Sequence, residues 1–183
     1  SGRCLALIGE SGSGKTTLAL ACMGLLPENA STEGNFQFHG ETFSPGDEKI
    51  FDRLRWNRLA MVFQNGAAHL NPVHRIIDQV AEPLIQHRRW KRPAARQRAG
   101  KALESLGLGT TYHLRYPHQL SGGQAQSVLI AMAGILDPEV LILDEPTSAL
   151  DAANKGIVTD VIDQAKSSGK AVLLITHDLE FAS

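Results

Sequence analysis

Residues 4–16 read CLALIGESGSGKT: an apolar run over 4–8, then the pattern G-x-x-x-x-G-K-[ST] over 9–16. A helical pattern follows it. A loop placed between a buried strand and the start of a helix directs successive backbone N–H groups at an anion. The stretch therefore predicts a phosphate-binding loop in an α/β fold.

Each part of this loop has an expected task. Gly9, Gly12 and Gly14 let the chain turn tightly around phosphate groups, Lys15 reaches the terminal phosphates as a point charge, and the Thr16 hydroxyl suits Mg²⁺. A glycine-rich turn that binds nothing is the alternative, which the preceding strand and following helix disfavour. The residues expected to contact nucleotide here are Gly9, Glu10, Ser11, Gly12, Ser13, Gly14, Lys15, Thr16 and Thr17.

A second apolar run, 140–143, ends in Asp144-Glu145-Pro146. Continuous apolar runs are typical of buried parallel strands, and open α/β sheets bind ligands at the carboxyl ends of such strands. Because neighbouring side chains of a strand point to opposite faces, Asp144 and Glu145 are expected to have different tasks. We expect Asp144 to hold Mg²⁺ and Glu145 to polarise an attacking water. The alternative is a helix N-cap with a solvated neighbour.

Residues 120–124 read LSGGQ and precede a helical run, 125–136, that stops at Asp137-Pro138. Ser121 is a good N-cap, and the adjacent glycines leave bare N–H groups at the positive end of a helix. The chain thus has two phosphate-binding devices but only one Lys15, so the second is expected to serve a nucleotide held by another copy. Its predicted residues are Ser121, Gly122, Gly123 and Gln124.

With these residues the chain resembles the ATP-binding cassette (ABC) ATPases, whose signature is L-S-G-G-Q. Smaller landmarks occur in the family's order: Gln64 matches the Q-loop glutamine, residues 148–151 match the D-loop, and His177 matches the switch histidine. The resemblance implies ATP and Mg²⁺ as cofactors. It implies that Gln64 senses the metal or the water, that His177 contacts the γ-phosphate, and that Asp151 lies near the nucleotide.

The order of the patterns favours a P-loop NTPase of the α/β class, with a mostly parallel core sheet flanked by helices and an inserted helical subdomain. Residues 1–64 and 125–183 are expected to form the ATP-binding core, and 65–124 the helical subdomain ending in the signature. Predicted strands cover 4–8, 59–63, 140–143 and 171–176, with a hairpin over 33–43. Predicted helices cover 14–25, ended by Leu26-Pro27, then 54–58, 125–136 and 152–166, with a helical region over 73–106. The apolar stripe of that region is Ala95, Ala99, Ala102, Leu103 and Leu106.

Composition adds limits. The chain has 183 residues, 43% of them hydrophobic, and a formal net charge of -1, which disfavours a nucleic-acid partner. No stretch reaches the roughly 18–20 apolar residues that span a bilayer, so a soluble subunit is expected. Cys4 and Cys22 fit apolar patterns and predict buried free thiols in a reducing compartment. The chain begins with Ser1 rather than Met and ends six residues after His177, so we expect a fragment without the adenine-stacking and C-terminal segments of the family.

One region is strongly basic. Between Arg88 and Lys101 there are seven basic residues, no acidic residue, and Trp90. A solvated helix face is the favoured interpretation of such a run, and contact with anionic headgroups or an acidic partner is the alternative.

Three stretches, 61–65, 70–72 and 116–119, resemble the dipeptide, oligopeptide and nickel importer branch of the ABC ATPases. This implies an ATP-hydrolysing subunit on the cytoplasmic face of the inner membrane. Its expected partners are a second ATPase subunit, identical or related, transmembrane permease subunits and, indirectly, a solute-binding protein. Two features depart from the branch: Asn65-Gly66 replaces Asp-Pro, and Ser127 stands where Arg is usual.

Two other functions stay open from the sequence. One is an ABC ATPase acting on DNA or ribosomes, although the long coiled coil and the paired cassettes of those proteins do not occur in this chain. The other is a subunit resembling the accessories of phosphonate carbon–phosphorus lyase, which would bind no permease.

Overall fold

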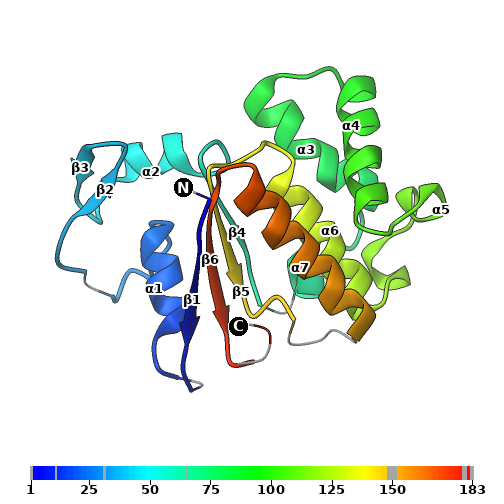
Figure 1. The fold of residues 1–183 in the computed structure, drawn as a ribbon. Coiled ribbons are helices and arrows are strands. Elements are labelled where there is room, and N and C mark those ends of the chain that lie inside the picture. The colour runs from blue at the N-terminus through cyan, green and yellow to red at the C-terminus, as the bar shows by residue number, and fades with distance from the viewer. Residues whose placement is uncertain are drawn as a thin grey trace.

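Four parallel strands form the centre of the computed structural model, which describes residues 2–10, 12–30, 32–64, 66–147, 152–178 and 181. The order across the sheet is β1 (Cys4–Ile8), β6 (Ala171–Thr176), β5 (Val140–Asp144) and β4 (Leu59–Val62). All three pairings are parallel. The carboxyl ends of the strands therefore meet at one edge, the lower edge in Figure 1. The prediction of a mostly parallel α/β sheet is confirmed.

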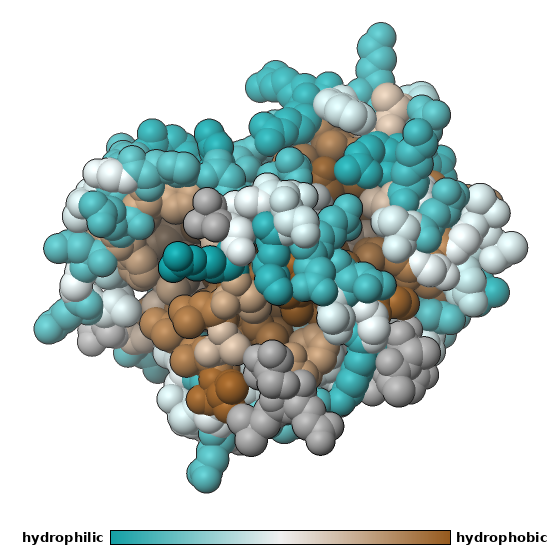
Figure 2. Space-filling model, in the orientation of Figure 1, coloured by the Kyte–Doolittle hydropathy of each residue, from teal (hydrophilic) through white to brown (hydrophobic). Residues whose placement is uncertain are grey.

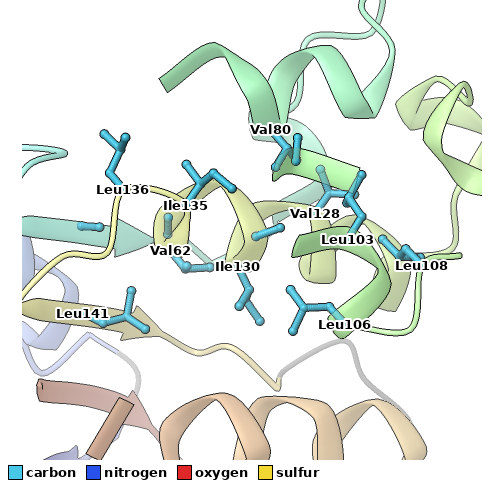
Figure 3. Close-up of a cluster of buried hydrophobic side chains, with 14 of the residues drawn as sticks. Val62, Val80, Leu103, Leu106, Leu108, Val128, Ile130, Ile135, Leu136 and Leu141 are labelled. Atoms are coloured by element: carbon cyan, nitrogen blue, oxygen red, sulfur yellow. The ribbon is translucent and has the colours of Figure 1, made fainter. Parts of the chain in front are cut away.

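Helices cover both faces of this sheet (Figure 1). Helix α1 (Lys15–Cys22) lies on one face, and α6 (Gly122–Gly134) and α7 (Ala152–Ser167) lie on the other. Strand alternation sorts the core accordingly: Leu141 and Leu143 of β5 join the larger cluster beside α6, part of which is shown in Figure 3, whereas Ile142 packs with the α1 side. Each strand thus has apolar side chains on both faces, as expected for a buried parallel sheet.

A layer of helices packs against α6. It consists of α3 (Ile76–Arg88), α4 (Arg92–Ser105) and the short α5 (Thr110–His113), with 3₁₀ turns η1 (Gly66–His69) and η2 (Pro117–Gln119). The helical region expected over 73–106 is therefore two helices, separated at Arg89, whose φ is 54°. Four residues of the predicted stripe, Ala95, Ala99, Leu103 and Leu106, are buried, and Ala102 is partly buried. Because α6 packs on both α3 and β4, the subdomain boundary at residue 124 stays a prediction.

The expected hairpin forms a small sheet of its own. Strands β2 (Phe36–Phe38) and β3 (Glu41–Phe43) pair antiparallel through His39 and Gly40, both with positive φ. Helix α2 (Glu48–Leu54) follows, and the Asp47 side chain accepts a hydrogen bond from the Ile50 N–H at its start. The short helix expected over 54–58 was therefore misplaced, because Asp47 sets an earlier start.

The end of α1 also differs from expectation. The predicted stop at Leu26-Pro27 is wrong, because the helix ends at Cys22 and Gly24 adopts a left-handed φ of 64°. The Leu25 N–H then donates to Leu20 O at 2.8 Å, a closure typical of glycine-ended helices. A Cβ on Gly24 would lie 2.5 Å from the ring of Phe51 on α2. This glycine therefore lets α1 end against α2.

Other surface features follow from this arrangement. Figure 2 shows hydrophobic residues gathered over β1 and α1, where the exposed large apolar residues are Leu5, Ile8 and Leu18. Cys4 and Cys22 are free thiols, as predicted, but only partly buried, and burial raises the pKa of both. In the described part of the chain, every helix is too short or too polar to span a bilayer.

Replacing Gly24 by Ala tests the junction of α1 with α2. We expect Gly24→Ala to lower the free energy of unfolding by about 3 kcal/mol, because a left-handed residue gains a side chain and that side chain meets the Phe51 ring. Gly169→Ala is the matched control, since Gly169 also has a positive φ of 78° but open space around it, and should cost about 1 kcal/mol. Denaturant unfolding measures both. Equal losses in the two variants would contradict the steric account.

Candidate functional site

The phosphate-binding loop predicted at residues 9–16 wraps around its own lysine. The Lys15 ammonium donates to Gly9 O and Glu10 O, both at 2.7 Å, and to Ser13 Oγ at 3.3 Å. Left-handed backbone at Gly12 (φ 83°) and Gly14 (φ 88°) makes this turn possible. Among the described residues no side chain caps the start of α1, so the N–H groups of its first turn and the Lys15 charge face the same anion site.

Asp144 lies at the carboxyl end of β5, on the same face of the strand as Ile142, and is only 1% exposed. That face is the α1 side of the sheet, which brings its carboxylate toward Thr16. The pKa of Asp144 is raised above its usual value, chiefly by burial and also by the neighbouring charge of Glu145. Contact with Thr16 and the charge of Lys15 act in the opposite direction. Neither carboxylate oxygen has a hydrogen bond of normal geometry in the described structure. A buried carboxylate without such partners is well suited to a cation.

Glu145 leaves the strand pattern, because its φ is 47°. Its N–H still donates to Ile175 O at 2.9 Å, while its carboxylate Oε2 lies 2.8 Å from Nδ1 of His177. Left-handed backbone is rare for a residue with a side chain and concentrates at functional sites. The sequence predicted separate tasks for Asp144 and Glu145, but it carried no signal for this turn or for the pairing with His177.

A cavity of about 530 Å³ joins these groups at the carboxyl edge of the sheet. The structure thus brings together four separately predicted segments: the loop, the end of β5, the residues after β4 and the residues after β6. Ser11 and Asp151, like the rest of 148–151, lie outside the described residues. The cavity is lined by Glu10, Gly12, Gly14, Lys15, Thr16, Thr17, Gln64, Asp144, Glu145 and His177.

The residues after β6 contain contacts that the sequence analysis missed. The Oγ1 atom of the fully buried Thr176 accepts a hydrogen bond from the Asp178 N–H at 3.0 Å, and Lys155 of α7 pairs with the Asp178 carboxylate at 2.6 Å. These two contacts fix the backbone on either side of His177. Their only sequence signal was that Thr176 and Asp178 flank the histidine.

The signature lies elsewhere in the same chain. Ser121 Oγ accepts from the Gln124 N–H at 3.3 Å, and Gln124 Oε1 accepts from the Ser121 N–H at 3.0 Å. This reciprocal cap was readable from the S-x-x-Q spacing, whereas the bond from Gln124 Nε2 to the Tyr112 hydroxyl was not. The predicted N-cap is confirmed. None of residues 121–124 lines the cavity, and α6 lies on the sheet face opposite α1.

The donor set fits Mg²⁺ better than a transition metal. No group of three or more His, Cys, Asp or Glu that could hold a metal occurs among the described residues. Magnesium bound with a nucleotide needs only one or two protein ligands, because phosphate oxygens and water supply the others. The buried Asp144 carboxylate and the Thr16 hydroxyl beside it meet this need.

The parallel sheet, the loop and this cavity define a P-loop nucleotide-binding protein. A model of the ABC transporter family matches residues 1–148. The chain therefore belongs to the ABC transporter family, which confirms the resemblance drawn from the sequence.

Similar proteins include the oligopeptide transport ATP-binding proteins OppD of Mycobacterium tuberculosis and AppD of Bacillus subtilis. The first is 40% identical over 182 residues, covering 97% of this chain and 30% of OppD, and the second is 38% identical over 187 residues, covering 100% of this chain and 57% of AppD. The chain thus spans from under a third to just over half of these relatives. The dimeric ABC cassette MJ0796 bound to ADP and Pi is 30% identical, with a TM-score of 0.87, over 99% of this chain and 77% of that one.

Removing the Asp144 charge is expected to stabilise the nucleotide-free protein. Because burial raises the pKa of Asp144, the folded state binds this proton more tightly than the unfolded state, and the ionised group costs stability near neutral pH. Asp144→Asn should raise the free energy of unfolding by about 1 kcal/mol at pH 7. The gain over wild type should shrink as the pH falls through the raised pKa.

Denaturant unfolding at several pH values checks this, with Asp160→Asn as the control on an exposed carboxylate of α7. The control should change stability by less than about 0.5 kcal/mol. A loss of stability in Asp144→Asn at neutral pH would contradict the account.

Proposed function

We propose that this chain is the ATP-binding and hydrolysing part of an ABC importer subunit that powers uptake of peptides or similar small solutes through a membrane permease. The observation that carries the proposal is the cavity that joins the loop, the buried Asp144 carboxylate and the Glu145–His177 pair. The names of the relatives, which are oligopeptide and dipeptide transport ATP-binding proteins, support the class of solute.

The loop would bind the β- and γ-phosphates of ATP. Its N–H groups and the start of α1 attract the anion, and the Lys15 ammonium, now held by the carbonyls of Gly9 and Glu10, turns part of its hydrogen bonding to phosphate oxygens. Thr17, in the first turn of α1, also lines the cavity beside the phosphates.

Thr16, Asp144 and Gln64 would hold Mg²⁺, which when bound neutralises phosphate charge as the γ-phosphoryl group transfers to water. In this role Thr16 supplies a hydroxyl oxygen and Asp144 a carboxylate oxygen, directly or through water. Gln64 lines the cavity from the end of β4. The Gln64 side chain would therefore sense whether the metal or the attacking water is present in the site.

Glu145 would orient the attacking water and accept its proton. Its carboxylate is largely buried, lines the cavity and is oriented by its pairing with His177 at 2.8 Å, which suits a group that accepts a proton from water. His177 is mostly exposed toward the cavity and would contact the γ-phosphate. A positioned carboxylate with a donor beside it suits in-line attack on a phosphoryl group.

A second copy would complete the site. Residues 121–124 do not reach the cavity of their own chain, so Ser121, Gly122, Gly123 and Gln124 would close over the γ-phosphate bound by a partner, with Asp151 near the shared interface. The similarity to dimeric MJ0796 structures supports such a pair, of identical or related chains. ATP would then hold the pair closed and hydrolysis would reopen it.

The remaining assignments follow from the importer proposal. The partners would be permease subunits and, through them, a solute-binding protein, with the chain on the cytoplasmic face of the membrane. Residues 1–64 and 125–183 would act as the ATP-binding core and 65–124 as the helical subdomain. The alternatives on DNA, ribosomes or phosphonate lyase are not favoured by the transport names of the relatives.

Glu145→Gln tests the hydrolytic role. The variant should bind ATP with unchanged affinity and accumulate as an ATP-bound dimer, while its turnover falls about 100-fold or more, because Gln cannot accept the proton. Steady-state phosphate release and size-exclusion chromatography with ATP measure this. The control is Glu139→Gln, the same change immediately before β5, at its other end, which should keep full activity. Normal turnover in Glu145→Gln would remove Glu145 from the mechanism.

A further inference from the structure

A second cavity, of about 350 Å³, lies between α4, α6 and α7. Its lining includes Leu141 near the start of β5 and Lys170 just before β6, so it lies at the amino-terminal edge of the sheet. It shares no lining residue with the nucleotide cavity at the opposite edge. The proposed ATPase function makes no use of it.

The lining of this cavity contains apolar side chains from α4, α6, α7 and β5. Leu106 follows α4, Ile130 and Ile135 come from α6 and its end, and Leu141 comes from β5, and all four are less than 10% exposed. Figure 3 shows Leu106, Ile130 and Leu141 on the side of α6 that faces α7, and Ile135 at the end of α6. A concave site of a few hundred Å³ whose lining combines apolar and polar groups is of the size that holds small molecules.

The rim of the cavity is basic. The basic residues of α4 lie on two sides of the helix, one toward α3 and one toward the cavity. Arg92 and Arg96 face α3, where both lie 3.3 Å from Asp78. Arg98 and Lys101, three residues apart on α4, are exposed and line the cavity instead. Neither has an ion-pair partner in the described part of the chain.

One acidic residue opposes these charges. Among the described residues, three cations line the cavity, Arg98, Lys101 and Lys170, against the one carboxylate of Asp137. Lys170 is already paired with Asp137. Arg98 and Lys101 therefore leave an excess of two positive charges beside an apolar surface, which complements a molecule with an anionic head and an apolar body.

We propose that this cavity binds a small organic anion, an alkyl phosphate or alkyl carboxylate, with its charged group between Arg98 and Lys101 and its alkyl body against Ile130, Ile135 and Leu141. The concave shape favours a free small molecule over a flat membrane surface, because the apolar residues lie recessed behind the charged rim. The inference is independent of ATP hydrolysis.

Isothermal titration of the protein with octanoate, an alkyl carboxylate that lacks the phosphate group which the loop at residues 9–16 is proposed to bind, tests the charged half of the site. We expect saturable binding of one molecule per chain. The double variant Arg98→Ala, Lys101→Ala should weaken it about tenfold or more, because two charge-assisted contacts are lost. Arg92→Ala, on the α3 side of the same helix, should leave it unchanged. Acetate, which has only the charged group, and octanol, which has only the alkyl body, should also bind about tenfold more weakly or not at all.

A blocking variant tests the cavity itself. Gly134, at the end of α6, lines it and has open space where a Cβ would stand, so Gly134→Leu should fill the cavity and abolish binding while the helix stays folded. Gly156→Leu makes the same change on the exposed face of α7, with equal free space, and should bind normally. Absence of saturable binding to the wild type, or binding that survives both Gly134→Leu and the loss of Arg98 and Lys101, would overturn the proposal.

Discussion

The buried carboxylate of Asp144 is the group on which the arrangement of the site depends. It is held at the end of a strand, away from solvent and without a hydrogen bond of normal geometry among the described residues. Such a group is costly in an empty site and favourable beside a cation. The alternation of β5 turns it toward Thr16, and the parallel order of the sheet brings it beside the loop after β1. The buried Asp144 carboxylate thus lowers the stability of the fold but is held in a preorganised position near the proposed phosphate site.

The parallel sheet separates the two predicted phosphate-binding sites, the loop at residues 9–16 and the signature at residues 120–124. Helix α1, which begins with Lys15, and helix α6, which begins after Ser121, lie on opposite faces. Both helix starts can attract anions, and the first has Lys15 and the Asp144 carboxylate nearby. The capping box of Ser121 and Gln124 fixes the second helix start through hydrogen bonds within the chain. A rigid donor group of this kind suits docking onto a nucleotide held by another molecule.

The sequence predicted the parts whose signals are local. The strands 4–8, 140–143 and 171–176 and the N-cap at Ser121 were readable from apolar runs and residue types, and the order of the landmarks identified the family. The end of α1 was predicted wrongly although its signal is local: the prediction used Pro27, whereas the left-handed Gly24 ends the helix earlier. The ring of Phe51, far along the chain, explains why the residue there is glycine.

The left-handed backbone of Glu145 and its bond to His177 likewise depend on the packing of β5 against β6. Contacts between distant segments of this kind leave no pattern in a single sequence. The basic run near Arg98 shows a further limit, since only the fold reveals that its charges face two different surroundings.

Mixing two inactive variants gives the most direct test of the central claim, that each catalytic site is shared between two copies. Lys15→Ala removes the positive charge with which the phosphate-binding loop would hold ATP. Ser121→Asp keeps a good N-cap but places a negative charge against the γ-phosphate that the partner would bind. Each variant alone should hydrolyse almost no ATP. An equal mixture should recover about a quarter of wild-type activity, since half of randomly formed pairs are mixed and each mixed pair has one intact site. A mixture as inactive as its components, or full hydrolysis by Ser121→Asp alone, would contradict a shared site.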